Sequence, residues 1–98
     1  MRFARNVQFQ IKNGKEQEFS SIFEKEVVPM LRRQAGFQQE VTLVNPKNAL
    51  GISLWEDRKS AETYLTETYP QVLAKLTPVL DGTPKVETYE TASTYART

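Results

Sequence analysis

The sequence contains no cysteine and no histidine among its 98 residues. Without cysteine, the chain cannot form a disulfide, a thiolate nucleophile or an iron–sulfur cluster. Without histidine, it lacks the base of a Ser-His-Asp triad and the imidazole ligand of a haem. These two absences leave carboxylate, lysine, tyrosine, arginine and amide groups to carry any chemistry of the chain.

Aspartate is scarce as well, because Asp57 and Asp81 are the only two aspartates in the sequence. A calcium loop gathers several carboxylate and carbonyl ligands within a dozen residues. No segment of the sequence has that pattern, so we expect a protein without a metal site.

Long apolar runs and blocks of like charge are also missing. No run approaches the eighteen or so apolar residues that span a bilayer, and the first residues lack the apolar segment of a secretory signal. Thirteen Lys and Arg balance twelve Asp and Glu, which gives a net charge of +1. We therefore expect a cytoplasmic protein with no membrane partner and no nucleic-acid partner.

The length fits a single domain over residues 1–98. Alternating apolar residues predict strands over about residues 2–11, 37–44, 50–55 and 83–91. Apolar residues at helical spacing predict one helix between the first two strands and a second one, in two segments, between the last two. The order of the elements is therefore βαββαβ.

Local signals refine this reading of the first helix. Asn13, followed by a glutamate three residues later, is typical of a helix N-cap, and Gly36 is a natural stop. Pro29 lies inside the helix, where it removes a backbone donor and crowds the preceding turn. We expect a kink there, which either opens a pocket or follows the curvature of the sheet.

The βαββαβ order predicts an α+β, ferredoxin-like fold, with two helices on one face of a four-stranded antiparallel sheet. The helices can cover only one face of that sheet. We expect the other face to carry apolar residues among polar ones, namely Ala4, Gly51, Ser53, Trp55 and either Tyr89 or Val86. Such a face is too apolar to be left bare, so the sequence predicts a homodimer with Trp55 or its neighbours in the interface.

Several segments carry a resemblance to a known family: Arg32-Arg33-Gln34-Ala35-Gly36-Phe37, Trp55 to Glu62, Tyr64-Leu65 and Tyr69-Pro70. Together with the βαββαβ order, they resemble the antibiotic-biosynthesis-monooxygenase superfamily. The resemblance implies a homodimer whose sheets pack face to face as a dimeric α+β barrel, with a small cavity between sheet and helices. It also implies activities that range from cofactor-independent oxygenation of aromatic polyketides and quinol oxidation to haem degradation.

The haem-degrading branch of this superfamily uses an asparagine on strand one, a tryptophan in the second helix and a histidine ligand further on. Val7, Tyr64 and Ala74 stand at the corresponding positions of this sequence. None of the three residue types is retained. We therefore expect no haem degradation.

For the oxygenases that use no cofactor, the resemblance implies a cavity lined by aromatic and polar groups. A tyrosine hydroxyl there can donate a hydrogen bond to a developing enolate or peroxide oxygen. The expected catalytic residues are Tyr64 and Tyr69, and the expected substrate-binding residues are Val7, Phe9, Phe23, Trp55 and Arg33. No cofactor is expected.

Two functions stay open at this point. One is a monooxygenase that acts on a small aromatic, quinol or polyketide-type substrate. The alternative is a non-catalytic dimeric domain that binds a small molecule or serves a structural role. An RNA-binding module of the same topology needs stacking aromatics in the middle of strands one and three and a basic surface, and the segment from Leu50 to Leu54 offers none.

Overall fold

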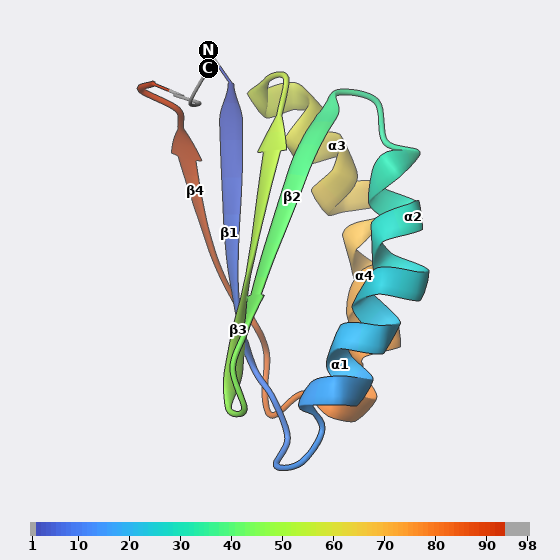
Figure 1. Ribbon diagram of the computed structural model, residues 1–98. Helices are drawn as coiled ribbons and strands as arrows, with labels where there is room; N and C mark the ends of the chain where they lie inside the picture. The colour runs from blue at the N-terminus through green and yellow to red at the C-terminus, as the bar shows by residue number, and fades with distance from the viewer. Residues whose placement is uncertain (1, 94–98) are drawn as a thin grey trace, which may run out of the picture.

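The computed structural model describes residues 2–93 and shows two layers, an antiparallel sheet and a layer of helices on one of its faces (Figure 1). The elements are β1 (Phe3–Gln10), α1 (Glu16–Ile22), the π-helical segment η1 (Phe23–Val27), α2 (Val28–Arg32), β2 (Phe37–Val44), β3 (Asn48–Trp55), α3 (Arg58–Glu67), α4 (Tyr69–Leu76), the 3-10 turn η2 (Thr77–Val79) and β4 (Lys85–Glu90). The strand order is β2-β3-β1-β4. This architecture confirms the predicted α+β, ferredoxin-like fold.

The central strand β1 sets which side chains face the helices. Its inward side chains alternate with outward ones, and Phe3, Val7 and Phe9 are each no more than 5% exposed. Val7 lies opposite Gly51 of β3 and Val86 of β4. Residues directly opposite one another share a face of the sheet, so this register fixes the inward face of all three strands.

The helical layer buries an aromatic cluster against this face. The ring of Phe9 lies 5.3 Å from the ring of Phe19 in α1 and 6.3 Å from that of Phe23 at the start of η1. Helix α4 contributes Val72 and Leu76, both nearly inaccessible to solvent. Burial of these apolar side chains is the main force that holds the two layers together.

The first helix begins near the predicted place but without the predicted cap. Its N-cap residue is Lys15, and no side chain caps it, so the assignment of Asn13 was wrong. Asn13 instead lies in a turn with Gly14, closed by a hydrogen bond from Lys15 N to the Lys12 carbonyl, and Gly14 has φ +76°. The turn requires the left-handed conformation that glycine allows, and it places Asn13 outside the helix.

The expected kink near Pro29 takes the form of a π-helical turn. The N–H of Val28 donates to the carbonyl of Phe23, five residues earlier, just before the proline in the first turn of α2. A widened turn lets the helix pass the proline, which offers no N–H of its own. Such turns occur often at functional sites.

The sequence also predicts a turn at Asn45-Pro46 and a cap of the next helix at Asp57 or Ser60, and both predictions are confirmed. The Asn45 side chain accepts hydrogen bonds from the backbone N–H groups of Lys47 and Asn48, which closes the β2–β3 hairpin. The Asp57 side chain accepts from the N–H of Ser60 and caps α3.

The orientation of β3 is opposite to the prediction. Gly51, Ser53 and Trp55 face the helices, because they lie opposite inward residues of β1. Trp55 is fully buried, with its ring 5.0 Å from that of Tyr64 and 5.5 Å from that of Phe37. Trp55 therefore cannot form the predicted subunit interface.

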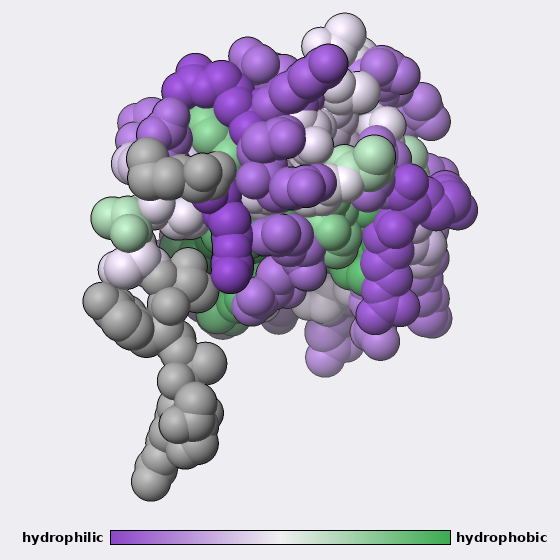
Figure 2. Space-filling model, turned by 90° about the horizontal axis from the view of Figure 1, so that it is seen from above, coloured by the Kyte–Doolittle hydropathy of each residue, from purple (hydrophilic) through white to green (hydrophobic). Residues whose placement is uncertain are grey.

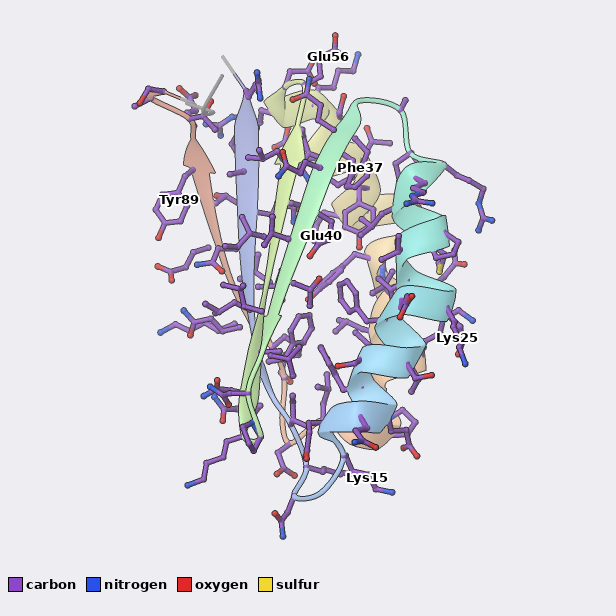
Figure 3. The ribbon with its side chains drawn as sticks, viewed as in Figure 1. Lys15, Lys25, Phe37, Glu40, Glu56 and Tyr89 are labelled. Carbon is purple, nitrogen blue, oxygen red and sulfur yellow. The ribbon has the colours of Figure 1, made fainter. Side chains whose placement is uncertain are left out.

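The outer face of the sheet is more apolar than predicted. Its apolar side chains are Ala4, Val41, Leu43, Leu50, Ile52, Leu54 and Tyr89. Leu43 and Tyr89 are about half exposed, and Figure 3 shows Tyr89 pointing away from the helices while Glu40 points toward them.

The end of the molecule that is uppermost in Figure 1 is, in contrast, mostly hydrophilic, with small hydrophobic areas between the polar side chains (Figure 2). Within residues 2–93, no helix is both long enough and apolar enough to cross a membrane.

Candidate functional site

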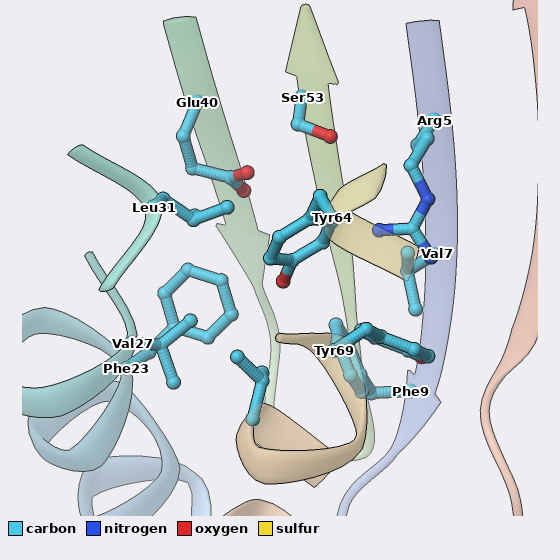
Figure 4. A pocket seen from close by; sticks show the side chains of 12 residues that line it. Arg5, Val7, Phe9, Phe23, Val27, Leu31, Glu40, Ser53, Tyr64 and Tyr69 are labelled. Atoms are coloured by element: carbon cyan, nitrogen blue, oxygen red, sulfur yellow. The ribbon is translucent and has the colours of Figure 1, made fainter. Parts of the chain in front are cut away.

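A small cavity lies between the sheet and the helices, at the level of the middle of β1 (Figure 4). Its apolar wall comes from both layers and consists of Val7, Phe9, Phe23, Val27, Leu31 and Val72. Its polar groups are Arg5, Glu40, Ser53, Tyr64 and Tyr69. A mainly apolar space with a few convergent polar groups is typical of a small-molecule site.

The cavity exists because β3 carries small side chains under the helices. Gly51 and Ser53 form its floor, while the strands on either side carry larger residues. A Cβ atom on Gly51 would lie 3.3 Å from Glu40 Oε2 and 3.3 Å from Phe9 Cε2. The missing side chain therefore lets the Phe9 ring and the Glu40 carboxylate approach the backbone of β3.

Three polar residues form a row across the sheet at the rim of this floor. Glu40 on β2 lies opposite Ser53 on β3, and Ser53 lies opposite Arg5 on β1. Adjacent strands are about 4.8 Å apart, so the backbones at Glu40 and Arg5 are separated by about 10 Å. The Ser53 hydroxyl between them accepts a hydrogen bond of 2.9 Å from Trp55 Nε1.

Arg5 is the unusual member of the row, because it is only 3% exposed and has no ion-pair partner within residues 2–93. Its guanidinium lies 4.5 Å from the centre of the Tyr69 ring and 5.1 Å from that of the Tyr64 ring. These contacts offset part of the cost of burying the charge. Nη2 makes no hydrogen bond to any described residue.

The two tyrosines cover the cavity from the helical side. Both are buried, and their ring centres are 6.0 Å apart. Burial raises the pKa of each hydroxyl above its usual value, and the positive charge of Arg5 only partly opposes this effect. Both hydroxyls are therefore neutral hydrogen-bond donors near neutral pH, and that of Tyr69 is buried without a partner among residues 2–93.

Glu40 supplies the titratable group of the site. Burial raises the pKa of its carboxyl to about 7, against the lowering effects of the Thr42 hydroxyl and the Arg5 charge. The Thr42 hydroxyl donates a hydrogen bond of 2.9 Å to Oε2. A carboxyl with a pKa near the ambient pH can both accept and release a proton, as general acid–base catalysis requires.

The volume of the cavity is about 20 Å³, which suffices for a water molecule but not for an aromatic ring. A surface groove of about 250 Å³ lies between α1–η1–α2 and the edge strand β2, lined in part by Phe23, Val28 and Val44. Phe23 lines both spaces.

The structure brings together most of the residues that the sequence placed in the site. Tyr64, Tyr69, Val7, Phe9 and Phe23 all line the cavity. Their roles in catalysis and binding stay predictions.

Two residues of the predicted site lie elsewhere. Trp55 stacks behind Tyr64 and supports the wall without lining it. Arg33 is exposed at the C-terminal end of α2, where its side chain does not line the cavity.

Sequence reasoning missed Arg5 and Glu40. The sequence could have shown that Arg5 faces the helices, because it occupies an inward position in the alternation of Phe3, Val7 and Phe9. The sequence gives no such indication for Glu40, because only the pairing of β2 with β3 shows that it faces the same space.

Residues 2–93 contain no cluster of three or more His, Cys, Asp or Glu side chains suited to a metal ion.

Solved structures share this fold over nearly the whole chain. A protein of unknown function from Nitrosomonas europaea superposes with a TM-score of 0.82 at 18% identity, over 99% of this chain and 95% of that one. SnoaB, a cofactor-independent oxygenase from Streptomyces nogalater, gives a TM-score of 0.81 at 17% identity, over 98% of each chain.

The monooxygenase ActVA-Orf6 of Streptomyces coelicolor, solved in complex with Nanaomycin D, gives a TM-score of 0.78 at 14% identity, over 98% of this chain and 92% of that one. Identities at this level show a common fold. None of the curated proteins compared with the chain matches it.

The family model described as "Antibiotic biosynthesis monooxygenase" matches residues 2–75. The matched region runs from β1 to α4 and therefore includes every residue that lines the cavity. The chain belongs to the antibiotic biosynthesis monooxygenase family.

Proposed function

We propose that the protein is a monooxygenase that needs no cofactor and acts on a small aromatic, quinol or polyketide-type substrate. One observation carries this proposal: a buried Arg5 guanidinium, with no ion-pair partner among the described residues 2–93, faces Tyr64 and Tyr69 in an apolar cavity. A buried cation with donor hydroxyls beside it suits a substrate that becomes an anion during the reaction. Family membership supports the same reading.

The chemistry can proceed from the substrate itself. Loss of a proton from an acidic CH₂ group or a phenol gives a carbanion or its enolate form, which donates electrons to O₂. A carbon–oxygen bond forms, protonation gives a hydroperoxide, and loss of water leaves a carbonyl group. A CH₂ group and O₂ thus become a C=O group and H₂O. In this scheme Tyr64 orients and polarises the anion.

A substrate of this size must first enlarge the cavity. The Phe23 ring separates the cavity from the groove beside β2, and it belongs to the π-helical turn. We infer that the substrate enters through the groove as this ring moves aside. Once closed, the apolar wall would keep bulk water away from the reacting anion.

The test is oxygen uptake with a panel of quinols and anthrones, in the presence of a metal chelator. Wild type should consume oxygen, and Tyr64→Phe should lower turnover by about ten- to hundred-fold while circular dichroism shows an intact fold. Tyr89→Phe is the matched control, since Tyr89 lies on the outer face of the sheet, outside the cavity, and the change keeps its aromatic ring. Equal rates for wild type and Tyr64→Phe would remove Tyr64 from the mechanism.

The alternative function is a dimeric domain that binds a small molecule without turnover, or one with a structural role. The water-sized volume of the closed cavity favours the structural role within this alternative. It predicts that Tyr64→Phe weakens binding and that no substrate of the panel supports oxygen uptake. Ligand titration and oxygen uptake on the same samples separate the two functions.

We also propose that the protein is a homodimer, in which the outer faces of two sheets pack together. This face carries exposed apolar side chains among polar ones, and Val41, Leu43 and Tyr89 are each at least 40% exposed. A surface of this kind marks an interaction site on a small domain.

A change of one side chain on this face tests the homodimer. Wild type should have twice the chain mass in light scattering at micromolar concentration, and Leu43→Lys should be monomeric, because it would bury a charge. Leu65→Lys is the matched control, since Leu65 has a similar exposure, 46% against 51%, but lies on α3. A monomeric wild type would contradict the proposal.

A further inference from the structure

The polar groups that line the cavity differ in whether they have hydrogen-bond partners. Arg5 Nη2 and the Tyr69 hydroxyl are buried and make no hydrogen bond within residues 2–93, whereas Glu40 accepts one from Thr42. Buried donors are nearly always satisfied, so two unpartnered donors on one cavity indicate a ligand that accepts hydrogen bonds. Arginine keeps its charge even when buried, which favours an anionic acceptor.

Glu40 is not that acceptor in the folded protein. Ser53 lies between the two residues in the sheet, and no ion pair joins Glu40 to Arg5. The cation and the carboxyl therefore face each other across the floor of the cavity (Figure 4). A molecule bound there would have a positive group on one side and a proton acceptor on the other.

We propose that Arg5 and Tyr69 bind an oxygen anion of the substrate, and that Glu40 accepts the proton whose loss creates this anion. The inference rests on the proposed function and deepens it. The O–H or C–H bond of the substrate breaks, its electron pair stays on the substrate as a phenolate or enolate, and the proton moves to the Glu40 carboxylate. The total charge of the site does not change, because one negative charge passes from Glu40 to the substrate.

The surroundings of Glu40 suit this role. Arg5 from β1, Tyr64 from α3 and Tyr69 from α4 are the charged or titratable groups that face the cavity with it, and the nearby residues of η1 and α2, Val27 and Leu31, are apolar. The two tyrosines cannot serve as the proton acceptor, since burial raises the pKa of both hydroxyls and keeps them protonated near neutral pH. Glu40 is the one carboxyl among the residues that line the cavity.

The site should therefore accept a neutral phenol, hydroquinone or enolisable ketone and hold it as a monoanion. A permanently charged acid such as a benzoate offers an oxygen anion to Arg5 but no proton to Glu40. It should bind as an inhibitor, and its affinity should fall as Glu40 loses its proton, since two negative charges would then share the cavity.

The experiment uses anaerobic binding, so that no turnover occurs. Dithranol and 1,4-naphthohydroquinone are titrated into the full chain, and absorbance reports how much of each bound probe is ionised. Wild type should hold the probes as anions at a pH where they are neutral in water. Arg5→Gln should lower the ratio of anion to neutral probe by about tenfold or more, since removal of a close cation shifts an ionisation by at least one unit.

Further variants separate the individual roles. Arg5→Lys should still hold part of the bound probe as the anion. Tyr69→Phe should hold a smaller fraction of the bound probe as the anion than wild type does. Glu40→Gln should leave the final spectrum of the anion in place but slow its formation about a hundredfold in stopped-flow mixing, because the internal acceptor is gone. Arg33→Gln is the control for loss of an arginine, since Arg33 is exposed.

Two results would overturn the inference. One is an equal degree of ionisation in wild type, Arg5→Gln and Arg33→Gln, with all three folded. The other is the absence of any bound anion in wild type. If wild type still consumes oxygen in either case, the inference fails while the proposed function stands. If it binds anions without oxygen uptake, the proposed function fails and the oxyanion site stands.

Discussion

The carboxyl of Glu40 makes a specific prediction about stability. Burial raises its pKa from 4.5 to about 7 in the folded protein. The folded state therefore binds this proton more tightly than the unfolded chain does. Between those two pH values, the unfolded chain has released the proton while the folded protein still holds it, so the free energy of unfolding must fall as the pH rises.

The size of this effect follows from the shift. One pKa unit corresponds to about 1.4 kcal/mol, so the full shift from 4.5 to about 7 corresponds to at most about 3.5 kcal/mol. Glu40 is partly exposed, and solvent screening reduces this figure. We expect the free energy of unfolding to fall by about 1 to 3 kcal/mol between about pH 4.5 and pH 7.5. The stabilisation from the Glu40 proton is fully present below that range.

Replacing Glu40 by glutamine removes the titration but keeps the size and shape of the side chain. Denaturant unfolding of wild type and Glu40→Gln at a series of pH values measures the difference. The variant should gain about 1 to 3 kcal/mol relative to wild type as the pH rises through this range, and the gain should then level off. Glu62→Gln, an exposed change on α3, should show no such trend. A difference between wild type and Glu40→Gln that does not depend on pH would refute the reasoning.

Two further predictions concern the fold. Gly36→Ala should destabilise the protein far more than Gly82→Ala. Both glycines have a positive φ, which costs alanine about 1–2 kcal/mol. Of the two, only Gly36 would place the new Cβ where it overlaps the side chain of Ser60. Thermal unfolding of both variants checks this, and equal losses would contradict it. Ser53→Ala should cost about 1–3 kcal/mol, because it leaves the buried Nε1–H of Trp55 without an acceptor. Fluorescence of this single tryptophan follows the unfolding, and an unchanged midpoint would refute the assignment.

The sequence predicted those parts of the fold that depend on local signals. The bounds of β2, the hairpin after it and the Asp57 cap of α3 agree with the structure, since each depends on residues that are close in the chain. The Asn13 cap was wrong because a neighbouring glycine allowed a competing turn.

The orientation of β3 could not be obtained in the same way. Leu50, Ile52 and Leu54 alternate with Gly51, Ser53 and Trp55, and the more apolar set was assigned to the core. Alternation separates two faces but does not say which one the helices cover. The pairing with β1 decides it, and that pairing joins residues that are from 38 (Gln10 and Asn48) to 52 (Phe3 and Trp55) positions apart.

The same contrast between local signals and long-range strand pairing applies to the candidate site. Helical spacing was sufficient to place Tyr64 on the cavity side of α3. Arg5 and Glu40 face the cavity from strands on opposite sides of β3, and these two strands are distant in the sequence. A buried arginine and a half-buried glutamate also run against the usual preference of charged residues for the surface, so hydrophobic patterning alone could not find them.

The most direct test of the central claim is the fate of isotopically labelled O₂. The wild-type protein, freed of metals by a chelator, is given an anthrone or hydroquinone that supports oxygen uptake, and the product is analysed by mass spectrometry. The proposed reaction predicts one labelled oxygen atom in each product molecule and the other in water. A product without labelled oxygen, or O₂ consumption balanced by hydrogen peroxide, would contradict a monooxygenase.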